Sequence, residues 1–358
     1  MKKFGFRLGM VLVWIGLIFT VLYWPKSEIP PFDERTINVF AWGDILDPTI
    51  VAQFEHETGI KVYLNYYASN EELVVKIKAT GGQGYDLIVP SEYAVRTLKK
   101  EGLLKPLDHS QLHFLNGLNP ALLNLKFDPG NQYSIPFTWE IYGLGISRPF
   151  FENRPLDPSW KMIFDPKVVD YKVAMSNDPV QTIDFAAYYL FGPIKELNSE
   201  QLQETVDLLI AQKKWVTAYA DFRADYFLAT KNCPVALSLS SYMIRAMRKF
   251  PFLGFVIPKE GTFVSVENVS IPAASKKEHL TYQLINYLYT AQSAQAHFDT
   301  YGLFPASAQN LPDLETDPEK KKILESCQEA FPKSYIGIVL ASQEKIRDAW
   351  VEIKSSSD

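Results

Sequence analysis

Residues 38–48, "NVFAWGDILDP", decide the fold class. The stretch opens with apolar residues, as a buried strand does, and ends in Asp47-Pro48, a favoured pair for the N-cap and first position of a helix. Between the two lie Trp42 and Asp44. Ligands bind at the carboxyl ends of strands in open α/β sheets. A strand that ends in a tryptophan and a carboxylate therefore raises a question about function.

The same pattern continues along the chain. Buried strands are predicted at 37–41, 61–66 and 85–90, with helices that begin at Asp47, at Ser69 and at Ser91. Glu72 stands three residues after Ser69, which predicts a capping box. This β-α-β-α-β order at short spacing predicts an α/β fold, with a mostly parallel sheet and helices on both faces.

A second α/β set is predicted downstream. A strand pair is expected near 133–147 and a return strand, "ENVSIPA", at 267–273. The further predicted strands are 172–176, 235–240 and 252–258, and the further helices are 180–191, 199–213, 241–249 and 277–302. Residues 311–358 are predicted to be largely helical.

The N-terminus predicts export. Lys2, Lys3 and Arg7 precede an apolar, uncharged run of roughly 17 residues, the pattern of a secretory signal or signal anchor. We interpret residues 1–25 as a signal peptide or N-terminal anchor and 26–35, rich in proline, as a linker. The sequence does not decide between cleavage of this segment and its retention as an anchor. A lipoprotein is excluded because this region has no cysteine.

Composition narrows the function classes. The chain has 358 residues with a formal net charge of −5, and removing five basic and three acidic groups within 1–35 leaves about −7 on the body. An acidic body argues against nucleic acid as a partner and permits a cationic ligand. No metal-ligand spacing is present, so no metal or other cofactor is expected. Sequence alone leaves open whether Cys233 and Cys327 pair.

Several polar and aromatic residues follow predicted strands. Trp42 and Asp44 could be a core ring and a loop acid, or a ring face and a carboxylate that converge on a cation. Ser91 could simply cap a helix, yet Tyr93 would share a sheet rim with Trp42. "GGQG" from Gly81 follows a helix and precedes a strand, the reverse of a phosphate loop, and is interpreted as a turn.

Two more stretches carry candidate residues. Asp178, before Pro179, suits a helix cap or a ligand, and Gln181 lies one turn further on. Glu267 is a charge in an apolar run, which needs a partner or a ligand. No nucleophile elbow and no Ser-His-Asp arrangement is visible, so no catalytic residue is predicted.

Several contiguous stretches of the sequence together resemble the periplasmic spermidine/putrescine-binding proteins of polyamine ABC importers. The matching stretches are "AWGDILDPTIVAQFEHETGIKV", "NEELVVKIKATGGQGYDLIVPSEYAV", "KEGLLKPLD", "FDPGNQYSIPFTW", "PKEGTF" and "INYL", in family order. The resemblance implies a two-lobed periplasmic binding protein (type II-like), in which each lobe is a mixed sheet flanked by helices. It implies lobe one from 36–140 plus 266–310, lobe two from 141–265 plus 311–358, and a ligand cleft between them.

The resemblance also implies binding residues. Trp42 and Tyr93 would supply ring faces for methylene chains, while carboxylates would hold the ammonium ends. The full set of implied ligand-binding residues is Trp42, Asp44, Ser91, Tyr93, Asp178, Gln181 and Glu267. The chain departs from the family at Gln181, where an acid is expected, and at Ile45, Leu239 and Ser265, where aromatic residues are expected. These departures predict an altered polyamine selectivity.

The resemblance implies a function without catalysis: a monomeric solute-binding component that captures putrescine or spermidine in the periplasm and delivers it to an ABC permease in the inner membrane. Two alternatives remain open at this stage. The same scaffold could bind another small amine or an amino acid, or the chain could be an exported two-lobed enzyme such as a transferase. Which amine is preferred, and which permease is the partner, is not determined by the sequence.

Overall fold

The structure is a computed structural model that describes residues 35–220, 224–311, 314, 317–336 and 339–356, together with Trp14. Residues 34–358 form one compact unit. The predicted export segment, 1–25, and the linker, 26–35, therefore lie outside the described residues except for Trp14 and Arg35. None of the helices in the described part has the length and apolar character needed to cross a membrane.

The predicted β-α-β-α-β start is confirmed. Three parallel strands form a sheet in the order β2-β1-β3. The strands are β1 (Thr36–Trp42), β2 (Lys61–Tyr67) and β3 (Leu87–Ile88), and the helices between and after them are α2 (Pro48–Thr58), α3 (Asn70–Thr80) and α4 (Glu92–Lys100).

Local signals set the ends of these helices. Asp47 caps α2 through hydrogen bonds from the backbone N–H groups of the first turn, and Gly59 ends the helix at φ 68°, which favours glycine. Ser69 caps α3 as predicted. The capping box is modified, because the Glu72 carboxylate accepts from the N–H of Ala68, one residue before the cap, at 2.7 Å.

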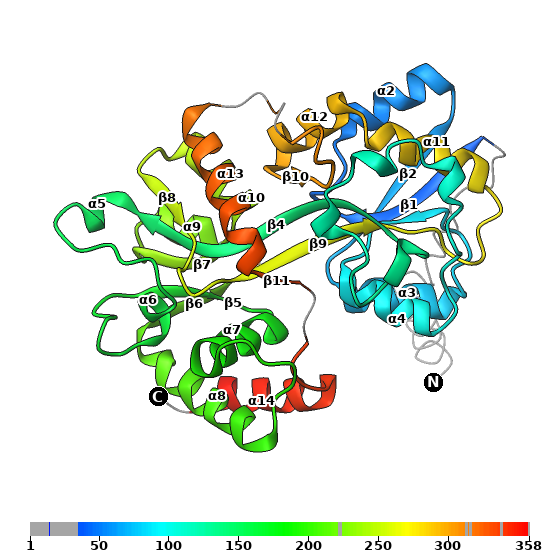
Figure 1. The fold of residues 1–358 in the computed structure, drawn as a ribbon. Coiled ribbons are helices and arrows are strands. Elements are labelled where there is room, and N and C mark those ends of the chain that lie inside the picture. The colour runs from blue at the N-terminus through cyan, green and yellow to red at the C-terminus, as the bar shows by residue number, and fades with distance from the viewer. Residues whose placement is uncertain are drawn as a thin grey trace, which may run out of the picture. The chain divides into compact units, whose positions relative to one another are not determined.

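Alternate residues of β1 contact different layers. Ile37 and Val39 belong to a core cluster with side chains of α2 and α11 (Glu278–Leu288), while Phe40 joins a second cluster with α3 and α4. Figure 1 shows α2, α11 and α12 (Ala291–Tyr301) on one side of the β1–β2 sheet and α3 and α4 on the other. The helices thus cover both faces of the sheet, as predicted.

One long strand replaces the strand pair predicted near 133–147. β4 (Ile135–Ser147) pairs with β9 (Phe263–Val269) and β10 (Phe304–Pro305) through its first half, and with β7 (Val235–Leu239) and β8 (Leu253–Val256) through its second half. Gly143 permits close packing of the sheet, since a Cβ there would lie 2.5 Å from the Phe255 ring. The prediction of two strands in this region is wrong, because a single strand runs through it and its two halves pair with different strands.

β9 connects the two groups of strands. Isolated antiparallel bridges join Ile88 to Ser270 and Ser91 to Glu267, so β9 lies beside the end of β3 as well as beside β4. Glu267 is inside this strand, and the prediction that the strand begins at Glu267 is corrected. The strand begins earlier because Val264 and Val266 are buried against β4.

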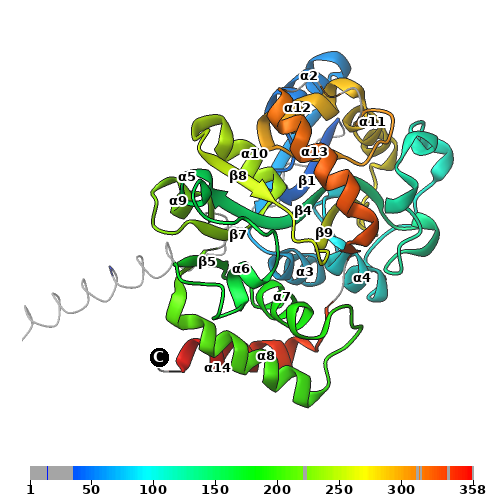
Figure 2. The ribbon, with the colours of Figure 1, turned by 60° about the vertical axis from the view of Figure 1, so that its left-hand side comes forward.

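The remaining strands and helices build the second α/β set. β5 (Val173–Ser176) pairs in parallel with β6 (Val216–Ala220) and β7, and β11 (Tyr335–Ile336) pairs with β9. Figure 2 shows α14 alongside α8, next to α7. The helices of this part are α5 (Arg148–Phe151), α6 (Lys161–Phe164), α7 (Pro179–Phe191), α8 (Ser199–Gln212), α9 (Ala224–Ala229), α10 (Ser240–Lys249), α13 (Pro318–Ala330) and α14 (Gln343–Ser355).

Three sequence-based expectations need correction or completion here. The helix predicted over 277–302 is two helices, α11 and α12, because Thr290 ends the run and caps α12 by accepting from the N–H of Ser293. β6 and α9 were not predicted. Cys233 and Cys327, whose pairing was left open, are both buried free thiols.

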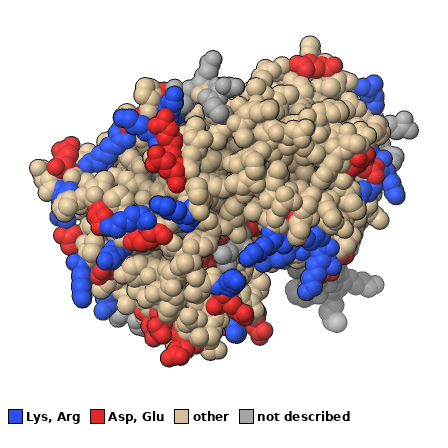
Figure 3. Space-filling view, in the orientation of Figure 1, with Lys and Arg blue, Asp and Glu red and all other residues tan. Residues whose placement is uncertain are grey.

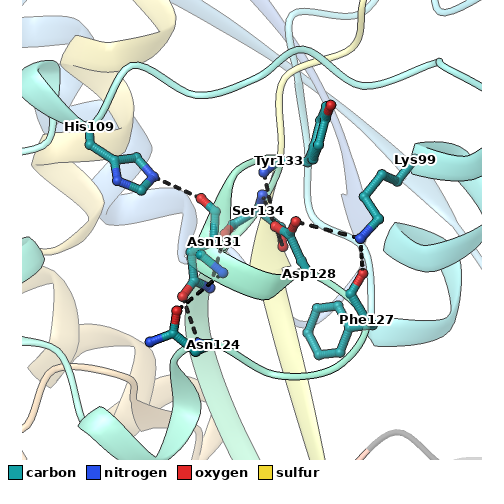
Figure 4. Close-up of polar contacts among 9 residues, drawn as sticks. Lys99, His109, Asn124, Phe127, Asp128, Asn131, Tyr133 and Ser134 are labelled. Carbon is teal, nitrogen blue, oxygen red and sulfur yellow. Dashed lines mark hydrogen bonds and ion pairs between the residues drawn. The ribbon is translucent and has the colours of Figure 1, made fainter.

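A hydrogen-bonded loop leads into β4 (Figure 4). One oxygen of Asp128, which is 1% exposed, accepts from Tyr133 N–H, Ser134 N–H and Ser134 Oγ at 2.8–2.9 Å. Lys99 Nζ lies 3.8 Å from its other oxygen. Short 3-10 helices occupy this connection: η1 (His109–Gln111), η2 (Leu115–Gly117), η3 (Pro120–Leu122) and η4 (Pro129–Asn131).

Candidate ligand-binding cavity

A cavity of about 740 Å³ lies where the first and second sheets meet. Trp42 and Tyr67 line it from the first sheet, and Ser176 and Leu239 line it from the second. All seven sequence-predicted binding residues are among the lining residues: Trp42, Asp44, Ser91, Tyr93, Asp178, Gln181 and Glu267. The structure therefore brings the predicted set to one place.

The Glu267 carboxyl is held in this lining by hydrogen bonds to both of its oxygens. Trp42 Nε1 donates to one Glu267 oxygen at 3.0 Å, and Ser91 Oγ donates to the other at 2.7 Å. Ser91 occupies the N-cap of α4 but makes no side-chain capping bond, because its hydroxyl donates to Glu267 and accepts from Asn70 Nδ2. The prediction that Ser91 caps this helix through its side chain is wrong for that reason.

Glu267 is 7% exposed, and its environment disfavours the charged form. Burial raises the pKa of Glu267 to about 8, with further upward contributions from Glu92 and Glu140. The hydrogen bonds from Ser91 and Trp42 act in the opposite direction. A cation beside this carboxyl would therefore stabilise its charged form and lower its pKa.

Glu92 and Glu140 were missed by the sequence analysis, and both line the cavity. Burial raises the pKa of each carboxyl. Glu140 accepts from the Ser241 hydroxyl, and one oxygen of Glu92 is buried without a hydrogen-bond partner among the described residues. Glu140 lies in the buried strand β4, so the reasoning applied to Glu267, a charge in an apolar run, could have found it.

Asp44 lines the cavity, but it is already paired with a cation. Its carboxylate lies 2.7 Å from Arg245 on α10, and the Arg245 guanidinium also lies over the Tyr242 ring, 4.6 Å from the centroid. Arg245 is the one basic residue among the described residues that line the cavity. A ligand ammonium at Asp44 would have to compete with this guanidinium.

Asp178 and Gln181 lie on the wall formed by the second sheet. Asp178 is the N-cap of α7 and accepts from Gln181 N–H at 2.9 Å, so the capping interpretation of Asp178 is confirmed. The Gln181 side-chain oxygen accepts from Ser176 Oγ at 3.0 Å. Both side chains still line the cavity, so capping and ligand contact are compatible at Asp178.

Aromatic rings supply much of the remaining surface. The Trp42 and Tyr67 rings lie 4.7 Å apart, and burial raises the pKa of Tyr142 well above its ordinary value. The aromatic lining residues are Trp42, Tyr67, Tyr93, Tyr142, Phe185, Tyr242, Phe263 and Tyr301. The positions of the predicted family departures, Ile45, Gln181, Leu239 and Ser265, also line the cavity.

Among the described residues, no group of three or more His, Cys, Asp or Glu side chains is arranged to hold a metal ion. What the arrangement offers chemically is ring faces for apolar or cationic groups and carboxylates for ammonium groups.

Comparison with known proteins adds independent findings. The family model "Bacterial extracellular solute-binding protein" matches residues 49–322. The chain is 27% identical to the putrescine/cadaverine-binding protein of Pseudomonas aeruginosa over 332 residues, which cover 89% of this chain and 93% of that protein. It is 30% identical to the putrescine-binding periplasmic protein PotF of Escherichia coli over 277 residues, 72% of this chain and 74% of PotF.

A solved structure is similar over nearly the whole chain. It is the spermidine/putrescine ABC transporter substrate-binding protein PotD from Streptococcus pneumoniae, in complex with calcium and HEPES. The likeness has a TM-score of 0.76 at 25% identity and covers 89% of this chain and 98% of PotD. It confirms the predicted fold class, a two-lobed α/β binding protein with helices flanking mixed sheets.

Proposed function

The chain belongs to the family of bacterial extracellular solute-binding proteins, and we propose that it is the component of an ABC importer that captures a polyamine, putrescine or spermidine. The bound polyamine would be delivered to a permease in the inner membrane. The names of its relatives, which bind putrescine, cadaverine or spermidine, support this ligand class.

One observation carries the proposal: the buried Glu267 carboxylate is held by Trp42 and Ser91 in the wall of the cavity. A buried carboxylate is unfavourable unless a cation or several hydrogen bonds compensate it. The adjacent indole and phenol rings provide faces that attract ammonium groups and cover methylene chains. A polyamine combines these two features.

The binding roles are assigned accordingly. Trp42 and Tyr93 would cover the methylene chain, Glu267 and Asp178 would each hold an ammonium group, and Ser91 would orient Glu267. Gln181 would offer an uncharged amide to the ligand, whereas an acid at this position would form an ion pair with an amine. Asp44 would contribute when Arg245 moves away from it.

The lobe boundaries are part of the proposal. Lobe one would comprise 36–140 plus 266–310, and lobe two 141–265 plus 311–358. Support comes from β4, whose pairing with β9 extends to Ile141 and whose pairing with β7 starts at Tyr142. A boundary at this exchange of partners would allow the lobes to close over a ligand by bending β4 and β9.

The cellular setting is proposed from the sequence and the relatives. The chain would be exported through residues 1–25 and act in the periplasm as a monomer, without nucleic acid. Its acidic body supports the last point. On the face drawn in Figure 3, acidic and basic side chains are interspersed on the left part. It would bind its ligand without catalysing a reaction, in keeping with its relatives, which are named as binding proteins.

A second candidate ligand is an amino acid with a distant amino group, and Arg245 is the observation that favours it. The guanidinium of Arg245 lines the cavity and would bind a ligand carboxylate if it left Asp44. The excess of acids in the lining favours the polyamine. An exported enzyme has less support, because the matching family model and the relatives are named for solute binding.

Thermal melting with putrescine, cadaverine, spermidine, spermine and 4-aminobutyrate tests the proposal. A ligand at about 100 times its Kd stabilises the protein by about 2.7 kcal/mol, which should raise the melting temperature by about 5 °C. 1,4-Butanediol, which has the same chain length as putrescine without the charges, is the control and should give no shift. A shift with 4-aminobutyrate alone would favour the second candidate, and no shift with any amine would refute the first.

Variants locate the site. Trp42→Ala and Glu267→Ala should each weaken polyamine binding, and Gln181→Glu should strengthen it by adding a carboxylate beside Asp178. Affinities equal to that of the wild-type protein in both alanine variants would place the site elsewhere.

A further inference from the structure

Strand register places Glu140 and Glu267 on one face of the β4–β9 pair. Glu267 lies opposite Thr138, and Glu140 lies opposite Ser265, so the two glutamates are diagonal neighbours. Diagonal neighbours have Cβ atoms at most about 7–8 Å apart, within reach of two long side chains. Tyr142, the next residue on this face of β4, lines the same cavity.

Glu92 approaches the same place from the start of α4. The bridge between Ser91 and Glu267 sets the first turn of α4 against β9, and the backbone N–H groups of Glu92 and Val266 donate to the Glu92 carboxyl. The other Glu92 oxygen is buried and has no hydrogen-bond partner among the described residues. It is an acceptor without a donor at the cavity wall.

The basic groups near these acids do not neutralise all of them. Arg96 faces Glu92, and Arg245 faces Glu140 while it is paired with Asp44. The titratable groups that act on Glu267 from other elements are acids and phenols: Glu92 on α4, Glu140 and Tyr142 on β4, and Tyr67 on β2.

Buried polar groups in native proteins are almost always hydrogen-bonded. The unpartnered oxygen of Glu92 is therefore a position where a bound ligand would supply a donor.

We propose that Glu92 and Glu140 join Glu267 in one anionic subsite that binds a terminal primary ammonium group of the ligand. This inference rests on the proposed function and assigns two specificity-determining residues to it. A primary ammonium group carries three N–H donors, which matches three carboxyls, whereas a secondary ammonium has two. The subsite therefore favours the end of a polyamine over its middle.

Binding at this subsite is coupled to a proton. Glu267, whose pKa is raised to about 8, is largely protonated in the empty protein at neutral pH, and the pKa values of Glu92 and Glu140 are raised as well. An incoming ammonium group favours the ionised carboxyls and lowers these pKa values, so the protein releases protons on binding. Affinity accordingly rises as the pH increases toward 8, while the ligand amine stays charged.

Titration calorimetry of putrescine tests the subsite at neutral pH in two buffers of different ionisation enthalpy. The wild-type protein should release about one proton per ligand. Glu92→Gln and Glu140→Gln should each weaken binding at least about 10-fold, the value of one lost charged hydrogen bond, and reduce the proton release. The matched control is Glu71→Gln, the same change at an exposed acid of the cavity lining, which should change affinity less than about 3-fold.

Melting temperatures of the unliganded variants separate binding from folding. Removing an acid whose pKa is raised in the empty protein should leave that protein as stable as the wild type or more stable. Weakened binding together with a retained melting temperature therefore supports the subsite. If Glu92→Gln or Glu140→Gln binds putrescine with wild-type affinity and wild-type proton release, the replaced glutamate does not belong to the subsite, and the proposal fails for that residue. It also fails if Glu71→Gln weakens binding as much, because the effect would then be the general field of the cavity. If the wild-type protein binds no polyamine, the proposed function itself fails.

Discussion

Replacing Glu267 with glutamine should make the empty protein more stable while weakening its binding of polyamine. Glutamine keeps one oxygen that accepts from Trp42 Nε1, and its amide group can donate to Ser91 Oγ, so the hydrogen bonds at 3.0 and 2.7 Å have replacements. What the substitution removes is an ionisable group that is 7% exposed. The variant thus isolates the cost of a buried charge.

The magnitude follows from the pKa of Glu267. A rise from 4.5 to about 8 corresponds to about 5 kcal/mol of unfavourable free energy in the ionised form. Because the folded pKa is raised, the folded protein binds more protons than the unfolded chain between these two values. Its stability therefore falls as the pH rises through this range. Between about pH 5 and pH 8 the stability difference in favour of Glu267→Gln should grow by about 3–4 kcal/mol.

Urea unfolding of the ligand-free proteins over this pH range, followed by circular dichroism at constant ionic strength, measures the difference. Glu71→Gln serves as the control, because it makes the same chemical change at an exposed acid. The free energies of unfolding of Glu267→Gln and the wild type could instead differ by the same amount from about pH 5 to pH 8. That result would refute the argument that burial raises the pKa of Glu267.

Three further predictions rest on individual contacts. Arg245→Met frees the Asp44 carboxylate, now 2.7 Å from the guanidinium, and should tighten putrescine binding by up to about 5-fold in calorimetry; weaker binding would mean that Arg245 contacts the ligand. Asp128→Ala removes the acceptor of three hydrogen bonds and should lower the free energy of unfolding by about 2–4 kcal/mol in urea titrations, whereas a loss under about 1 kcal/mol would contradict this. Burial raises the pKa of Cys233 to about 12 and also raises that of Cys327, so a thiol reagent should modify neither in the native protein and both after non-reducing denaturation; fewer than two reactive thiols then would reveal a disulfide.

Local chemistry made the first part of the fold predictable. The Asp47-Pro48 pair starts α2 and Gly59 ends it in the left-handed conformation, and both signals act within a few residues. The wrong predictions lie where distant segments decide the outcome. The 133–147 region was taken for two strands, and only the positions of β9, β7 and β8 show why β4 continues through it.

Prediction of the binding residues was limited in the same way, by contacts between segments that are distant in sequence. Glu267 could be predicted as a ligand residue because a charge in an apolar strand needs compensation, and the structure places it beside Trp42. Glu140 carried the same signal. Glu92 did not, because an acid in the first turn of a helix is ordinary. Only the bridge between Ser91 and Glu267 brings its carboxyl to the cavity.

The sequence by itself determined the α/β class, the ends of helices such as α2, and the types of residue that a cation site requires, because these depend on short-range propensity and periodicity. Tertiary structure alone decided which acids share a wall, that Arg245 pairs with Asp44, and that the Ser91 hydroxyl donates to Glu267 instead of capping its helix. The physical reason is that the pKa of a carboxyl and the partner of a hydroxyl depend on burial and on neighbours far away in sequence.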